Sequence, residues 1–122
     1  MRKHLLIISL LITLISYGCA TPTIYTKSPM VTYDKDTEYA VDTTEDGFSN
    51  TVYYSRYQFI PESDAVVAAC RSSLTSLAYE YAEKRGRQIQ PINEQRIKLS
   101  MGRNGFTGIT SCCATVSVKW NK

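Results

Sequence analysis

The most regular pattern of hydrophobic and polar positions lies in the middle of the chain, between Pro61 and Gly86. Apolar side chains recur there at intervals of three and four residues, as expected for one stripe of an amphipathic helix: Val66, Cys70, Leu74, Leu77 and Tyr81. Proline and acidic residues favour a helix start at this point, with Ser63 as a candidate cap. Gly86 favours a stop. The pattern therefore predicts one helix that ends before Gly86.

Residues 51–60, just before this helix, are dense in aromatic and β-branched side chains. Such a composition predicts a strand, which Pro61 would end. Upstream, residues 38–42 are expected to pair with this strand around Asp46-Gly47, because this dipeptide favours a hairpin turn.

Two further strands are predicted near the C-terminal end of the sequence. Apolar residues alternate with polar ones along the second strand, at Cys112, Ala114, Val116, Val118 and Trp120. Ile97, Leu99 and Met101 alternate in the same way, and Asn104-Gly105 favours a two-residue hairpin turn between the strands. With that turn, the numbers of paired residues sum to 209, and both apolar sets fall on one face.

These elements together predict an α+β fold. The expected architecture is a small antiparallel sheet of three to four strands, in the order β-α-β-β, with one amphipathic helix packed on its apolar face.

The first residues of the sequence have a different character. Arg2 and Lys3 form a basic start, an apolar run of eleven residues follows at positions 5–15, and the small residue Gly18 comes after it. A helix that spans a bilayer needs about 20 apolar residues, so this run is too short for a stable span. Its flanks are typical of a secretory signal peptide.

The segment Ser16-Tyr17-Gly18-Cys19 resembles the lipobox of bacterial lipoprotein precursors, in which a small residue precedes an obligatory cysteine. The resemblance covers residues 1–20, and it departs from the usual pattern at Ser16 and Tyr17. It implies a diacylglycerol on the Cys19 thiol, cleavage after Gly18, and a third acyl chain on the new amine. Ala20, in place of an aspartate, implies an outer-membrane location in a Gram-negative host. The alternative is an ordinary secreted protein in which Cys19 is a structural thiol.

The predicted organisation has three parts. Residues 1–18 form the signal peptide, and residues 37–122 form the small α+β domain. Between them, residues 19–36 are rich in Thr, Ser and Pro and lack a periodic pattern. This middle part is predicted to be the lipidated N-terminus and a flexible tether.

The remaining cysteines follow from the expected faces of the helix and the sheet. Cys70 lies on the helix stripe and Cys112 on the sheet face that meets it, which favours a disulfide between them. Small exported domains often need such a bond, because their cores are small. A Cys70–Cys113 pair and free thiols remain alternatives. Cys113 must point to the opposite face, since side chains alternate along a strand, and is expected to be a free thiol, either structural or redox-active.

Composition narrows the function further. The formal net charge of +3 is too small to argue for nucleic-acid binding. It is unevenly distributed, with a net −4 over residues 20–50 and +5 over residues 51–122. The single histidine, His4, lies in the predicted signal peptide, so the processed chain would contain no imidazole for a catalytic triad or a histidine-bound zinc ion. We therefore predict no catalytic residue, no metal and no cofactor.

Three classes of function remain. The leading prediction is a non-catalytic lipid-anchored envelope protein, held in the membrane at Cys19, whose periplasmic domain binds or supports another envelope component. The second is a redox or envelope-stress sensor that acts through Cys113; its layout loosely resembles the disulfide-bearing stress-sensing lipoprotein of the Rcs phosphorelay. The third, an enzyme that acts on cell wall or lipid, is disfavoured by the absence of a nucleophile motif.

Overall fold

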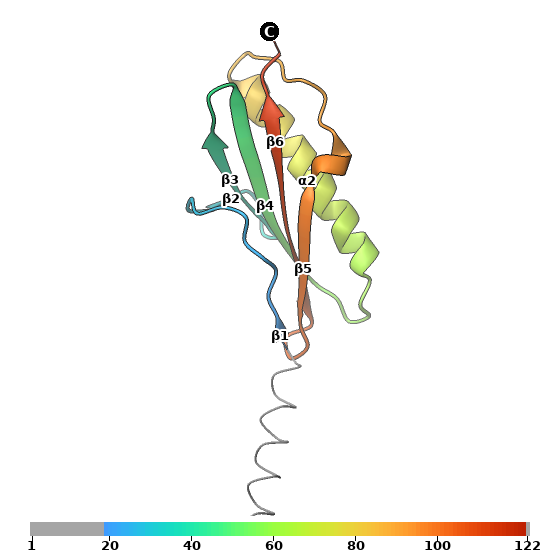
Figure 1. Cartoon of the computed structure of the whole chain (residues 1–122). Helices are drawn as coiled ribbons and strands as arrows, with labels where there is room; N and C mark the ends of the chain where they lie inside the picture. The colour runs from blue at the N-terminus through green and yellow to red at the C-terminus, as the bar shows by residue number, and fades with distance from the viewer. Residues whose placement is uncertain (1–18, 122) are drawn as a thin grey trace, which may run out of the picture.

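A computed structural model describes residues 19–121 of the chain. In this part of the chain one antiparallel sheet is packed against one α-helix, α2, which covers a single face (Figure 1). The order across the sheet is β1-β5-β6-β4-β3-β2. The strands are β1 (Cys19–Ala20), β2 (Val31–Thr32), β3 (Thr37–Thr43), β4 (Gly47–Tyr57), β5 (Lys98–Asn104) and β6 (Ile109–Lys119). The predicted α+β class is confirmed, with two strands of only two residues each, β1 and β2, added at the edges.

The helix α2 spans Ser63–Lys84, as the apolar periodicity predicts. It ends where Gly86 adopts a positive φ of 61°, a backbone conformation that glycine accepts without strain. Ser63 is the first helical residue and not the cap; Glu62 occupies the cap position, and its side chain makes no capping hydrogen bond. Instead, the side chain of Gln58 exchanges two hydrogen bonds with the Glu62 backbone, which fixes the loop before the helix.

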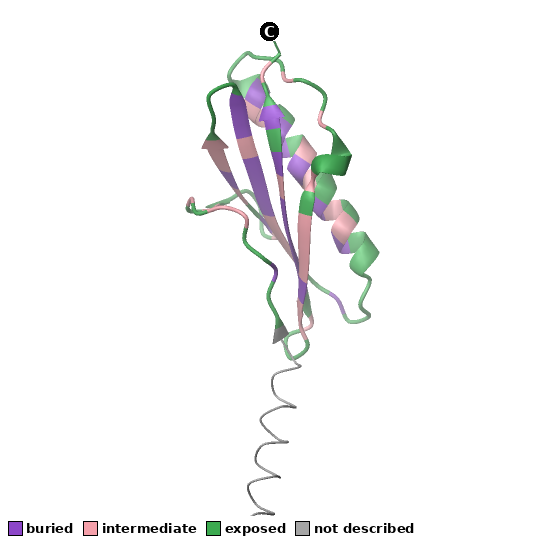
Figure 2. Ribbon diagram, viewed as in Figure 1, coloured by how far each residue is buried: buried purple, intermediate pink, exposed green. Residues whose placement is uncertain are grey.

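The hydrophobic core lies between α2 and the facing side of the sheet. The core is formed by one stripe of the helix and by alternate residues of the two central strands, β4 and β6. Both strands are buried over most of their length (Figure 2), because residues of the opposite face, such as Thr51 and Cys113, are buried as well. Phe48 and Leu74 are the largest side chains with no exposed surface. The ring of Phe48 also packs against Tyr81 and Trp120, at centroid distances of 4.5 and 5.1 Å. The alternating pattern of β6 therefore marks the core face correctly.

The register of the β5–β6 hairpin differs from the prediction. Met101 pairs with Cys112 and Asn104 with Ile109, so paired residues sum to 213 and not to 209. The cause is the turn, which contains four residues, 105–108, because the Asn104 side chain accepts hydrogen bonds from the Phe106 and Thr107 backbone. Since the shift is an even number of residues, the predicted apolar residues still share one face.

The predicted hairpin between β3 and β4 is present, with Thr43 paired to Phe48. The strand β4 begins at Gly47, earlier than the aromatic segment 51–60 indicates, and it ends at Tyr57. Phe59 and Ile60, which were expected in this strand, lie in the loop before α2.

Residues 19–32 cross the sheet face opposite α2, which we call the second face. We call this segment the N-terminal strap. Its first two residues form β1 against β5, and its last two form β2 against β3, so it reaches both edges of the sheet (Figure 1). This course differs from the flexible tether that the irregular composition of residues 19–36 suggests.

Candidate functional site

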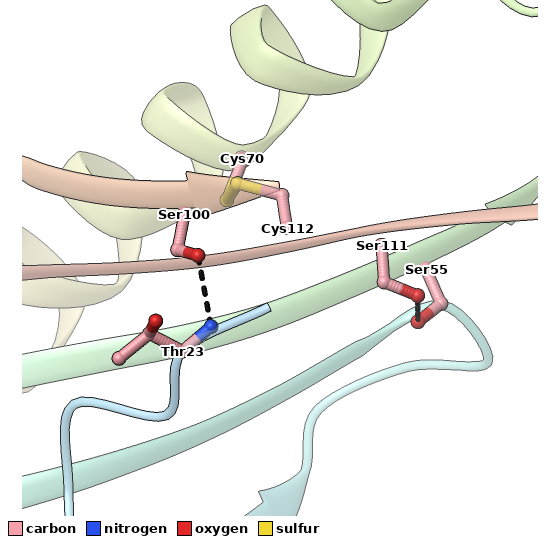
Figure 3. Close-up of a disulfide and its surroundings, with 6 residues drawn as sticks. All are labelled: Thr23, Ser55, Cys70, Ser100, Ser111 and Cys112. Carbon is pink, nitrogen blue, oxygen red and sulfur yellow. Dashed lines mark hydrogen bonds between the residues drawn. A yellow bond between two sulfur atoms is a disulfide. The ribbon is translucent and has the colours of Figure 1, made fainter. Parts of the chain in front are cut away.

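The Cys70–Cys112 disulfide is buried at the interface between α2 and β6, as predicted (Figure 3). The two Cα atoms are 6.3 Å apart, and neither residue has exposed surface. Because no solvent-borne thiol can reach these sulfur atoms in the folded state, the bond serves to join helix and sheet.

Cys113 is a free thiol on the second face and is completely buried. Burial raises the pKa of its thiol, and a hydrogen bond from the Tyr25 backbone acts in the opposite direction. The thiolate is the reactive form of cysteine, so a buried thiol with a raised pKa is a poor nucleophile at neutral pH. This environment is that of a structural cysteine.

The N-terminal strap is held on the second face by polar contacts. The Thr23 backbone donates to the Ser100 hydroxyl at 2.8 Å (Figure 3). Thr26 and Ser28 both donate to the carboxylate of Asp42, which lowers the pKa of that carboxyl group. These contacts place the strap over Cys113.

Close approach of the strap to β5 depends on Gly102. A Cβ atom at this position would lie 2.5 Å from the Ala20 carbonyl oxygen and 2.6 Å from Pro22 Cδ. The strap therefore lies directly on the β5 backbone, and Pro22 is buried there. The glycine in the middle of a strand is explained by this contact.

Cys19, the predicted lipidation residue, lies at one end of the sheet. Its backbone pairs with Asn104, the last residue of β5. The same end carries the β5–β6 turn and the loop before α2 (Figure 1). These two loops are joined by a hydrogen bond from the Gln58 backbone to the Gly108 carbonyl at 2.8 Å and by Arg103, whose guanidinium donates to Thr110 and to the Gln58 carbonyl.

Large apolar side chains are exposed on these two loops and at the strand ends beside them. We call this group the apolar end, and its members are Tyr57, Phe59, Ile60, Phe106 and Ile109. The exposed fractions of Phe59 and Phe106 are 86% and 80%. Sequence reasoning missed this group, because Phe59 and Ile60 were assigned to a strand and Phe106 was hidden within a glycine-rich turn.

A groove lies at the opposite end of β6. Beyond Thr115, β6 has no β5 partner, and the chain returns to it at the bridge between Ile89 and Trp120 and at Gln90, whose backbone donates to the Lys119 carbonyl. The groove lies between this returning segment and the end of β6, and its volume is about 780 Å³. We call it the β6 groove. Its lining includes the cationic side chains of Arg96, Lys98 and Lys119.

Within residues 19–121, no group of three or more His, Cys, Asp or Glu side chains is arranged to hold a metal ion. In the same range, no helix has the length and apolar character needed to cross a membrane. The predicted signal peptide, residues 1–18, lies outside the described residues.

Comparisons with protein-family models, with curated proteins and with solved structures find no match for this chain.

Proposed function

We propose that this chain is a non-catalytic lipoprotein of the bacterial outer membrane, anchored through Cys19, whose periplasmic domain binds another envelope component. The observation that carries the proposal is the position of Cys19. This cysteine follows a basic start, an apolar run and Gly18 in the sequence, and its backbone lies at one extreme end of the sheet. Acyl chains on Cys19 could therefore enter a bilayer without crossing the folded domain.

The disulfide supports the proposed location of the domain in an oxidising compartment. Cys70 and Cys112 come from different elements and form a buried bond that closes a loop with a sequence separation of 42 residues. Bonds of this kind persist in the periplasm and are rare in the cytosol.

The β6 groove is the place where we propose that the envelope partner binds. On the side that faces β5, the β6 wall has no strand partner between Thr115 and Lys119, so a short extended segment could pair there as an added strand. Arg96 and Lys98 give the lining a positive charge, which favours an acidic segment, whereas Lys119 lies 3.9 Å from the Asp46 carboxylate. We therefore propose an acidic extended segment of an envelope protein as the occupant.

The redox-sensor alternative is not favoured by the geometry. Cys113 has no exposed surface, and burial raises the pKa of its thiol. An oxidant would need the N-terminal strap to open before it could reach the sulfur atom.

Metabolic labelling of cells with palmitate tests the anchor. The protein should incorporate label, and globomycin should cause accumulation of the unprocessed precursor. Cys19→Ser should abolish incorporation, whereas Cys113→Ser, the matched control, should leave it intact. Absence of label in the natural chain would refute the lipoprotein proposal.

Crosslinking in whole cells followed by mass spectrometry tests the partner site. Arg96→Glu combined with Lys98→Glu should abolish crosslinks from the β6 groove to an acidic partner segment. Arg71→Glu, a charge reversal at an exposed position on α2, should leave them unchanged. Equal crosslinking in both variants would refute the proposed site.

A further inference from the structure

The geometry points to the apolar end as a membrane-docking surface: we propose that Phe59, Ile60 and Phe106 enter the lipid interface beside the acyl chains of Cys19. This inference deepens the proposed function and rests on it. It adds that the domain stands directly on the bilayer, where the irregular composition of residues 19–36 suggested a domain carried on a flexible tether.

The first step is the distance between the anchor and the domain. The Cys19 backbone pairs with Asn104, and Phe106 follows only two residues later. Opposed residues of an antiparallel pair are separated by roughly 5 Å between Cα atoms. Acyl chains attached to Cys19 therefore hold the β5–β6 turn close to the lipid surface. Gly102 keeps this arrangement compact, because it lets Ala20 and Pro22 lie on β5.

The second step is the concentration of apolar surface at this end. Of the nine large apolar side chains that are exposed in the described part of the chain, five belong to the apolar end. Three of the five are aromatic, and the loops that carry the two phenylalanines are hydrogen-bonded to each other. A concentration of exposed apolar side chains at one end of a domain favours an interaction site there, and aromatic side chains are favoured at the membrane interface.

The third step is the balance of charge around this surface. Arg56 and Arg103 lie beside the apolar end, and Glu62 and Asp64 follow Ile60 at the start of α2. Two cations against two anions provide no net attraction for an anionic polymer. The occupant that fits is therefore the apolar region of a bilayer, and contact with it should change little when salt is raised.

Docking of this kind would orient the whole domain. The strand β6 runs from Ile109 at the apolar end to Lys119 at the opposite end, a rise of roughly 34 Å at the usual spacing. The β6 groove and Trp120 would then face away from the membrane, where a partner can reach them.

Tryptophan fluorescence can test this orientation, because the natural chain contains one tryptophan, Trp120, at the far end. The lipidated protein and its Phe106→Trp variant are reconstituted in vesicles of phosphatidylethanolamine and phosphatidylglycerol with brominated acyl chains. The natural protein should lose less than about a tenth of its emission relative to unbrominated vesicles. The variant should lose about half of the emission that the introduced indole adds, and 0.5 M NaCl should not restore it.

A second pair of variants tests whether the introduced indole enters the membrane by itself, without help from the natural apolar side chains. In the Phe106→Trp background, Phe59→Ser with Ile60→Ser should reduce the quenching at least twofold. Tyr79→Ser, which removes a half-exposed aromatic ring on α2, should not change it.

The outcomes separate the two proposals. If the Phe106→Trp variant incorporates palmitate but the emission of its introduced indole is not quenched, the docking surface is overturned and the lipid anchor stays in place. A chain without palmitate overturns both. Quenching that is equal with and without the two serine substitutions also overturns the docking surface, because the natural side chains would then contribute nothing.

Discussion

On one face of the sheet, α2 buries Leu74 and Cys70 against apolar side chains of β4 and β6. On the other face, the N-terminal strap covers Cys113, and the sheet carries a row of hydroxyl groups, which includes the hydrogen-bonded pairs Thr51–Thr115 and Ser55–Ser111. The helix face is held by hydrophobic burial and a disulfide, and the strap by hydrogen bonds and the small size of Gly102. We infer that the helix side sets global stability, whereas the strap can be released locally.

The largest effect is expected from loss of the disulfide on the helix side. Cys70→Ala with Cys112→Ala should lower the free energy of unfolding by about 4 kcal/mol, because the unfolded chain regains the entropy of a loop of this length. Urea denaturation of a soluble form that carries Cys19→Ser measures the change. A loss below about 1 kcal/mol would show that the bond does not dominate this face.

A pair of single substitutions compares the two faces directly. Leu74→Ala should cost about 3 kcal/mol, because it leaves a cavity at a site without exposed surface. Thr115→Val on the second face keeps the volume and removes the hydrogen bonds to Thr51 and to the Asn50 carbonyl, so about 1 kcal/mol is expected. Equal losses in urea denaturation would contradict the proposed difference.

Gly102→Val should release the strap at a smaller global cost, about 1–2 kcal/mol. The new side chain would overlap Ala20 and Pro22, and the strap can move away from it. The measurement is the alkylation rate of Cys113 in the Cys19→Ser background, which should rise at least tenfold.

Gly86→Ala provides the control for that experiment. It places a side chain at a positive φ with no neighbouring atoms within 4 Å, and it should lower stability by about 1 kcal/mol. It should not accelerate alkylation. A similar acceleration in both variants would mean that Cys113 becomes reactive by global unfolding.

The smallest effect is expected from acid. Hydrogen bonds from Ser28 and Thr26 lower the pKa of Asp42 in the folded state below its ordinary value of 3.8. Their stabilisation is therefore present above pH 3.8 and is lost as the pH falls through the folded pKa. The protection of strap amides against hydrogen exchange, relative to their intrinsic exchange rate at the same pH, should fall below pH 3.8. Asp42→Asn should show reduced protection already at neutral pH and no further loss of protection with acid.

The helix side could be predicted from sequence because apolar periodicity encodes it. The stripe on α2 and the alternation on β6 each identify one face, and together they bring Cys70 against Cys112. The predicted hairpin register was wrong: the numbers of paired residues sum to 213 and not to 209. The reason is that a single side chain, that of Asn104, closes a longer turn than Asn104-Gly105 suggests.

The strap and the apolar end were not predicted, for two different physical reasons. The strap is bound through hydroxyl and backbone groups, as at Thr23 and Ser100, and such contacts leave no hydrophobic period. The apolar end is assembled from residues far apart in the chain, Phe59 and Phe106, which come together only when β4 and β6 pair. The signal that could have found it is the presence of large apolar residues within predicted turns.

The two ends of the strap have one further consequence. Two-residue strands cover part of each outermost long strand, β5 through β1 and β3 through β2, and both short strands belong to the same short piece of chain. A protease that cut within residues 21–30 would therefore weaken the attachment of both β1 and β2 to the sheet. Unpaired strands on opposite sides of one molecule are a template for chain-to-chain association, so such a clipped product would tend to polymerise into fibres.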